Sequence, residues 1–149
     1  MNRKRFLQAI LAVPLAASIR LKAAGPQVQV YKTPTCSCCG KWVQHLRNNG
    51  FEVSVQDVAD TTPYRRRYGV PETLGSCHTA VVEGYAIEGH VPASEIQRLL
   101  RERPKAKGLA VAGMPVGSPG MESTRSAAFS VMIFDAENHA SVYQKYPAK

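Results

Sequence analysis

Apolar and polar residues follow two different periods in the part of the chain after residue 25. Alternation over residues 28–31 predicts a β-strand, and residues 51–58 repeat a broadly alternating pattern. Between these strands, Trp42 and Leu46 recur at helical spacing, and Asn48-Asn49-Gly50 supplies a helix stop. The pattern therefore predicts a strand, a helix and a second strand in succession.

The same signals predict the rest of the chain. They indicate a short helix after Asp60, strands at residues 79–82 and 85–88, a helix from Pro92 to Arg103, a loop over residues 105–128, and a hairpin of residues 129–134 and 140–146. The predicted order is β-α-β-α-β-β-α followed by the hairpin. No internal repeat is visible, and the length fits one domain over residues 25–149.

Three cysteines stand where the first predicted strand gives way to the first predicted helix. They are Cys36, Cys38 and Cys39. A cysteine pair at this junction is typical of thioredoxin-like proteins. The predicted fold class is therefore α/β and thioredoxin-like, with a mixed central sheet flanked by helices and a C-terminal β-hairpin extension.

The positive charge is concentrated at the N-terminus. The chain has 149 residues and a formal charge of +8, and residues 1–24 contain five bases and no acid. A short basic stretch followed by the apolar run from Phe6 to Ile19 is the pattern of a secretory signal peptide. We expect cleavage within residues 18–24 and export to the periplasm, the alternative being an N-terminal amphipathic helix or an uncleaved anchor.

Export would change the interpretation of the charge. The chain from residue 25 has 14 bases and 11 acids, a net charge of +3. The dense basic run that remains, Arg65-Arg66-Arg67, is typical of a solvated helix face. We therefore expect no nucleic-acid partner, and no membrane association after cleavage.

The cysteines indicate soft-metal chemistry. Cys36 and Cys39 have C-x-x-C spacing with a third thiol between them, and Cys77-His78 adds a thiol and an imidazole from another segment. A helix N-terminus stabilises thiolates, and this donor set suits Cu(I) or, as the rival metal, zinc. Ser76-Cys77-His78-Thr79 also lacks the proline expected there in a dithiol oxidoreductase. Dithiol redox chemistry and two structural disulfides stay open as alternatives.

Other soft or imidazole donors form a second tier. Met114 and Met121 lie in the Gly/Pro-rich loop, either as thioether ligands or as cover for the core. His90 is either an outer ligand or a structural histidine. His45, in the middle of a helix, and His139, in a hairpin turn, are expected to face solvent.

Several of these motifs resemble one known family, the CopG-type periplasmic copper-resistance proteins, long catalogued as a domain of unknown function. The resemblance covers roughly residues 27–146 and is carried by residues 31–42 with their C-x-C-C, by Cys77-His78-Thr79-Ala80, by residues 85–92 and by residues 113–122. It implies a thioredoxin-like fold, a periplasmic location and copper binding. Carried over, the ligands would be Cys36, Cys38, Cys39 and Cys77, with His78 as a fifth.

The functional hypothesis is an exported protein of copper homeostasis that binds Cu(I), as a multinuclear cluster if the close sulfurs bridge ions. Its partners would be copper ions and other periplasmic copper-handling proteins. The alternatives are a periplasmic oxidoreductase that cycles Cu(I)/Cu(II) or a dithiol, and a structural exported domain with inert disulfides.

Overall fold

The computed structural model describes residues 24–149, so the predicted signal peptide lies outside the described residues. The elements are β1 (Gln27–Lys32), α1 (Ser37–Asn48), β2 (Glu52–Asp57), α2 (Thr62–Arg67), the 3-10 turn η1 (Glu72–Leu74), β3 (His78–Val82), β4 (Tyr85–Glu88), α3 (Ala93–Glu102), β5 (Gly108–Ala110), β6 (Phe129–Phe134) and β7 (Ala140–Tyr146). Within this part of the chain, no helix is long and apolar enough to cross a membrane.

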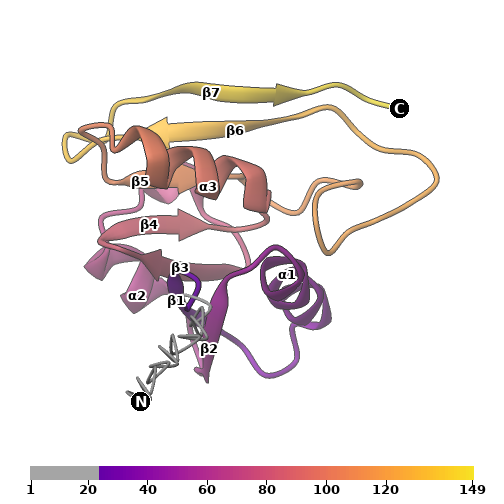
Figure 1. The fold of residues 1–149 in the computed structure, drawn as a ribbon, viewed down its shortest axis with the longest axis horizontal. Helices are drawn as coiled ribbons and strands as arrows, with labels where there is room; N and C mark the ends of the chain where they lie inside the picture. The colour runs from indigo at the N-terminus through magenta and orange to yellow at the C-terminus, as the bar shows by residue number, and fades with distance from the viewer. Residues whose placement is uncertain (1–23) are drawn as a thin grey trace, which may run out of the picture.

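All the strands belong to one mixed sheet with the order β2-β1-β3-β4-β5-β6-β7 (Figure 1). The pairs β1–β2 and β4–β5 are parallel, and the other neighbouring pairs are antiparallel. This arrangement confirms the mixed α/β class and the C-terminal hairpin, whose two strands have the predicted bounds. The prediction of an uninterrupted loop over residues 105–128 is wrong at its start, where β5 forms.

The two faces of the sheet carry different packing. In β4, Ile87 belongs to the large core cluster and Ala86 to a smaller one, because successive residues of a strand point to opposite faces. Trp42 of α1 and Ile96 of α3 are fully buried in the large cluster. The segment after α2 supplies Val70 to the smaller cluster. Helices α1 and α3 therefore cover one face and the α2 region covers the other.

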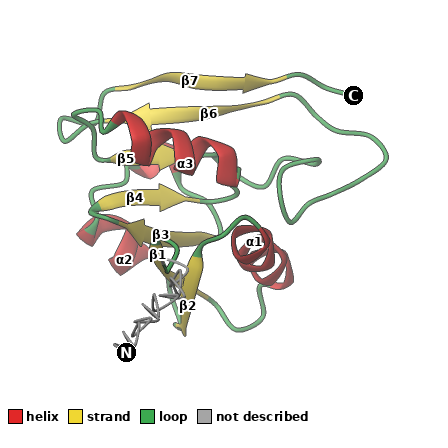
Figure 2. Ribbon diagram, in the orientation of Figure 1, coloured by secondary structure: helices red, strands yellow, loops and turns green. Residues whose placement is uncertain are grey.

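Local residue choices set the helix ends that matter for the site. Helix α1 follows Cys36 directly, and the chain leaves it through Gly50 at φ +86°, a left-handed conformation that glycine adopts freely. The prediction placed Pro92 inside the next helix, but α3 begins at Ala93 and Pro92 serves as its cap. A long loop then joins β5 to β6 and returns toward α1 (Figure 2).

Candidate metal centre

Strand pairing brings the two cysteine segments together. Lys32 at the end of β1 pairs with His78 at the start of β3 in an antiparallel register. The residue before His78, Cys77, therefore lies beside the chain that enters α1. The sulfurs of Cys36, Cys38, Cys39 and Cys77 all lie within 4.8 Å of one another. This places together the four thiols that the sequence analysis selected.

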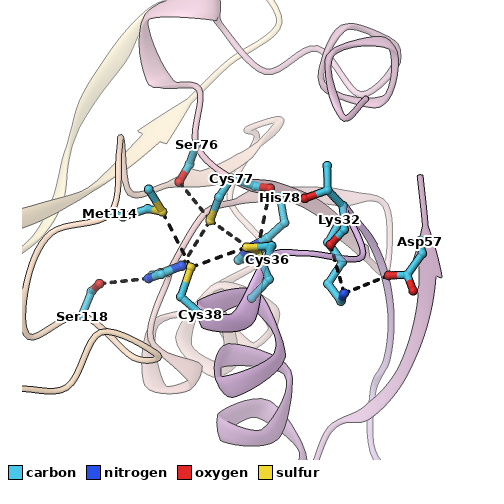
Figure 3. Close-up of a disulfide and its surroundings, with 12 residues drawn as sticks. Lys32, Cys36, Cys38, Asp57, Ser76, Cys77, His78, Met114 and Ser118 are labelled. Atoms are coloured by element: carbon cyan, nitrogen blue, oxygen red, sulfur yellow. Dashed lines mark hydrogen bonds and ion pairs between the residues drawn. A yellow bond between two sulfur atoms is a disulfide. The ribbon is translucent and has the colours of Figure 1, made fainter. Parts of the chain in front are cut away.

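Two of these cysteines form a bond in the structure. Cys36 and Cys39 are joined by a disulfide, whereas Cys38 and Cys77 are free thiols (Figure 3). Cys38 Sγ lies 3.5 Å from Cys36 Sγ. The second disulfide that the structural alternative requires is not formed. The cluster thus contains a C-x-x-C disulfide next to two thiols.

Cys77 also belongs to a second donor group, with His78 and His90. Its sulfur lies 3.2 Å from His90 Nε2 and 3.5 Å from His78 Nδ1. Both imidazoles are fully buried, and His78 Nε2 has no hydrogen-bond partner within residues 24–149. The structure therefore brings His90, from the second tier of candidates, into direct contact with the central thiol.

A serine in the loop between β5 and β6 sets the orientation of His90. The Ser118 hydroxyl donates to Pro115 O at 2.7 Å, so its oxygen is available to accept from His90 Nδ1 at 3.1 Å. A proton on Nδ1 leaves the lone pair of Nε2 directed at Cys77 Sγ. Metal-binding histidines are usually held in this way, with the nitrogen that does not bind the metal donating a hydrogen bond that fixes the tautomer.

The electrostatics favour neutral groups before a metal binds. Burial raises the pKa of the Cys77 thiol to about 11. Burial, and then the neighbouring His90, lower the pKa of His78 to about 3. Cys77 is therefore a thiol and His78 a neutral imidazole at pH 7. Metal binding at Cys77 would release a proton, as thiolate ligation requires.

The long loop covers the open side of the cluster. Met114 Sδ lies 3.7 Å from Cys38 Sγ (Figure 3), and Met114 is 49% exposed. Gly120 lies against α1 at φ +96°, where an added Cβ would come 2.6 Å from Cys38 O. The contacts of Met121 are within the loop, where its backbone N–H donates to Ser118 O and its carbonyl accepts from the Gly117 N–H. Of the two candidate methionines, Met114 is the one beside the thiols.

Two expectations about polar side chains are wrong. His45 is not solvent-facing, because its Nε2 accepts from the Ala93 N–H at 3.0 Å and its ring is partly buried. The arginine run is not uniformly solvated. Arg66 and Arg67 are exposed, but the Arg65 side chain is 13% exposed and pairs with buried Glu88 at 2.9 Å. His139 is exposed, as expected.

These contacts identify residues that sequence reasoning missed. Glu88, Arg65 and Ser118 all contact the segments that carry the candidate ligands. The sequence gives no sign that Glu88 is buried, because Glu88 is the last residue of a strand and polar residues are common at strand ends. Ser118 is one of several small polar residues in its loop. Only the folded contacts distinguish it.

The donor chemistry defines the class of site. Thiolate and thioether sulfurs with imidazole nitrogens are soft or borderline ligands, which suit Cu(I) and zinc far better than magnesium or calcium. The fold and the site therefore define a mixed α/β protein with a cysteine and histidine cluster compatible with soft-metal binding.

Comparisons with known proteins identify the family. A family model described as "Protein of unknown function, DUF411" matches residues 74–121. The solved structure "Copper resistance protein copG, Form 1" is 46% identical, with a TM-score of 0.77, over 81% of this chain and 97% of that one. Its Form 2 is 45% identical, with a TM-score of 0.79, over 83% and 99%. No curated protein matches the sequence. The chain belongs to the CopG family of copper resistance proteins.

Proposed function

We propose that this chain is an exported copper-binding protein of copper resistance that holds Cu(I) through Cys36, Cys38, Cys39 and Cys77. His78 and His90 would complete the site, with Met114 at its open side. The observation that carries the proposal is the convergence of four sulfurs within 4.8 Å beside two buried imidazoles. Three sulfurs from four consecutive residues are close enough to bridge copper ions, which supports a multinuclear site.

Copper binding by all four sulfurs depends on the state of the disulfide. Opening the Cys36–Cys39 bond to two thiols takes up two electrons and two protons. Two molecules of a small-molecule thiol, or one dithiol protein, would supply them and would be oxidised to a disulfide. We infer that the reduced form is the one that takes up Cu(I), because only it presents the full thiolate set.

The proposal includes the finer fold assignment and the location. The order β1-α1-β2-α2-β3-β4-α3, with strand order β2-β1-β3-β4, supports a thioredoxin-like core to which β5, β6 and β7 are added. A disulfide beside free thiols is compatible with the periplasm. Mass spectrometry of the protein recovered from a periplasmic fraction tests export. A chain that begins after residues 18–24 agrees with it, and an intact N-terminus contradicts it.

Metal analysis after anaerobic loading tests the central claim. The fully reduced protein is mixed with Cu(I), freed of excess metal and analysed for copper per chain. We expect at least one copper in the wild type and its loss when Cys36, Cys38 and Cys39 are all changed to serine. Ser37→Ala is the matched control, because Ser37 is exposed within the same motif and offers no sulfur. Equal copper in the wild type and the triple variant would refute the proposal, and zinc that displaces the copper would favour the rival metal.

The disulfide gives specific support to a second function, copper oxidoreduction. Two Cu(II) ions oxidise the reduced Cys36–Cys39 pair to the disulfide, yielding two Cu(I) ions and two protons, and the reverse reaction oxidises Cu(I). Anaerobic mixing of the reduced protein with Cu(II) and a colorimetric Cu(I) chelator tests this. We expect two Cu(I) per disulfide formed in the wild type. Formation of Cu(I) without loss of thiols would rule out this chemistry.

A further inference from the structure

We propose that Arg65 and Glu88 are positioning residues that fix Cys77 against the cysteines of α1. This inference rests on the proposed function, because its consequence is the affinity of the site for Cu(I). Neither side chain offers a soft donor. Both act on Ser76, the residue directly before Cys77.

Glu88 is the buried centre of the arrangement. Its side chain is 0% exposed at the end of β4. Oε1 accepts from the Ser76 N–H at 2.7 Å and from Arg65 Nε at 2.9 Å. Oε2 accepts from the Thr79 hydroxyl at 2.6 Å. Burial raises the pKa of Glu88, and the donors around its carboxylate oppose that rise. The carboxylate is thus fully engaged by the segment that contains Cys77.

Arg65 completes the hold on the same residue. Besides its bond to Glu88, its guanidinium donates from a second nitrogen to Ser76 O at 2.7 Å. Both backbone polar groups of Ser76 are therefore bound by one ion pair. The planar guanidinium can make these two bonds in fixed directions, which a lysine ammonium cannot reproduce.

The chain on the other side of Cys77 is tied to the same end of β4. The Gly89 N–H donates to His78 O at 3.0 Å. Cys77 thus lies between two anchored residues, one held by Glu88 and one by Gly89. The backbone of Cys77 is therefore held from both sides, which limits the positions that its sulfur can reach.

The same segment also holds the loop that carries Met114. The Gly113 N–H donates to Gly75 O at 3.3 Å, and the Ser76 hydroxyl donates to Gly113 O. A shift of residues 75–77 would therefore move both Cys77 and the thioether beside Cys38. The ion pair controls the geometry of the cluster at two points.

A purely stabilising role does not explain this ion pair. A buried ion pair adds little stability over apolar side chains of similar volume, because the two charges lose their hydration. Its specific contribution is geometric, because hydrogen bonds are directional and those of this ion pair fix the position of the Ser76 backbone. Residues that orient metal ligands from outside the site typically contribute about 10- to 100-fold to metal affinity.

Competition with a chromogenic Cu(I) chelator measures the effect in the reduced full-length protein. Glu88→Gln keeps the shape but removes the charge that holds Arg65, and Arg65→Lys removes the forked donor. We expect each to weaken Cu(I) binding by about 10- to 100-fold. Arg66→Lys and Glu72→Gln are the controls, because that pair lies on the same side of the fold with side chains 73% and 62% exposed. The controls should bind as the wild type does.

A double-mutant cycle with Cys77→Ser separates positioning from general stability. If Glu88 acts mainly through Cys77, Glu88→Gln lowers Cu(I) affinity in the wild type and lowers it markedly less in the Cys77→Ser background, where only its effect through Met114 is left. A loss of equal size in both backgrounds overturns the inference. Arg65→Lys enters the same cycle if circular dichroism finds Glu88→Gln unfolded.

The outcomes also separate the two proposals. A wild type that binds copper while Glu88→Gln and Arg65→Lys bind equally well overturns the positioning role alone. A wild type that binds no copper overturns the proposed function and the positioning role with it.

Discussion

The contact between the long loop and the start of α1 can be tested with one methyl group. Gly120 has φ +96°, and an added Cβ would lie 2.6 Å from Cys38 O and 3.2 Å from the Trp42 backbone nitrogen. Gly120→Ala therefore has two unfavourable effects. It places a side chain in the left-handed region, and it forces a carbon against a backbone oxygen that the helix holds in place.

Gly84 separates these two effects. It lies in the turn between β3 and β4 at φ +88°, where an added Cβ meets no atom of the described residues within 4 Å. Gly84→Ala should reduce the free energy of unfolding by the conformational effect alone, about 1–2 kcal/mol. Gly120→Ala should add an overpacking cost of about 1–3 kcal/mol, for a total of about 2–5 kcal/mol.

Urea unfolding monitored by far-ultraviolet circular dichroism gives both free energies. Cu(I) competition on the same proteins gives the functional consequence. Displacing the loop withdraws Met114 from Cys38 and Ser118 from His90, so Gly120→Ala should also bind Cu(I) more weakly than Gly84→Ala. If the two variants unfold at the same urea concentration, the loop is not packed on α1 as described and the reasoning fails.

Most elements of the fold were predictable because their signals are local. The predicted strands differ from β1 and β2 by one residue at each end and from β3 by one residue at its start, and β4, β6 and β7 have the predicted bounds. The exception is β5, with the three buried residues Gly108–Ala110. Its identity depends on partners far away in sequence, β4 on one side and β6 on the other. Three residues beginning with glycine provide no period from which to infer a strand.

The candidate site was predictable in part. Placing thiols at the end of a first strand and the start of a third was enough to expect Cys36 and Cys77 to meet, because these strands are neighbours in the predicted fold. Their roles as metal ligands stay predictions. Arg65 and His45 were misjudged for one reason. Helical periodicity shows which face of a helix is polar, but not that a polar side chain on it will meet a buried acceptor or donor.

Two further predictions concern polar contacts made by residues of α1. Trp42→Phe removes the 2.8 Å hydrogen bond from Nε1 to Val91 O inside the core, so the free energy of unfolding should fall by about 1–3 kcal/mol. Circular dichroism is the measure because Trp42 is the single tryptophan, and an unchanged stability would contradict the described contact. Burial lowers the pKa of His45 below its usual 6.5, and its neutral Nε2 accepts from Ala93 N–H. His45 therefore binds a proton more readily in the unfolded chain than in the folded one. The stability that neutral His45 contributes is complete above about pH 6.5 and is lost progressively as the pH falls from there through the lowered pKa of the folded state. In urea unfolding at about pH 7.5 and about pH 5.5, His45→Gln, which cannot be protonated, should lose less stability than the wild type. Equal losses would show that His45 does not titrate in this contact.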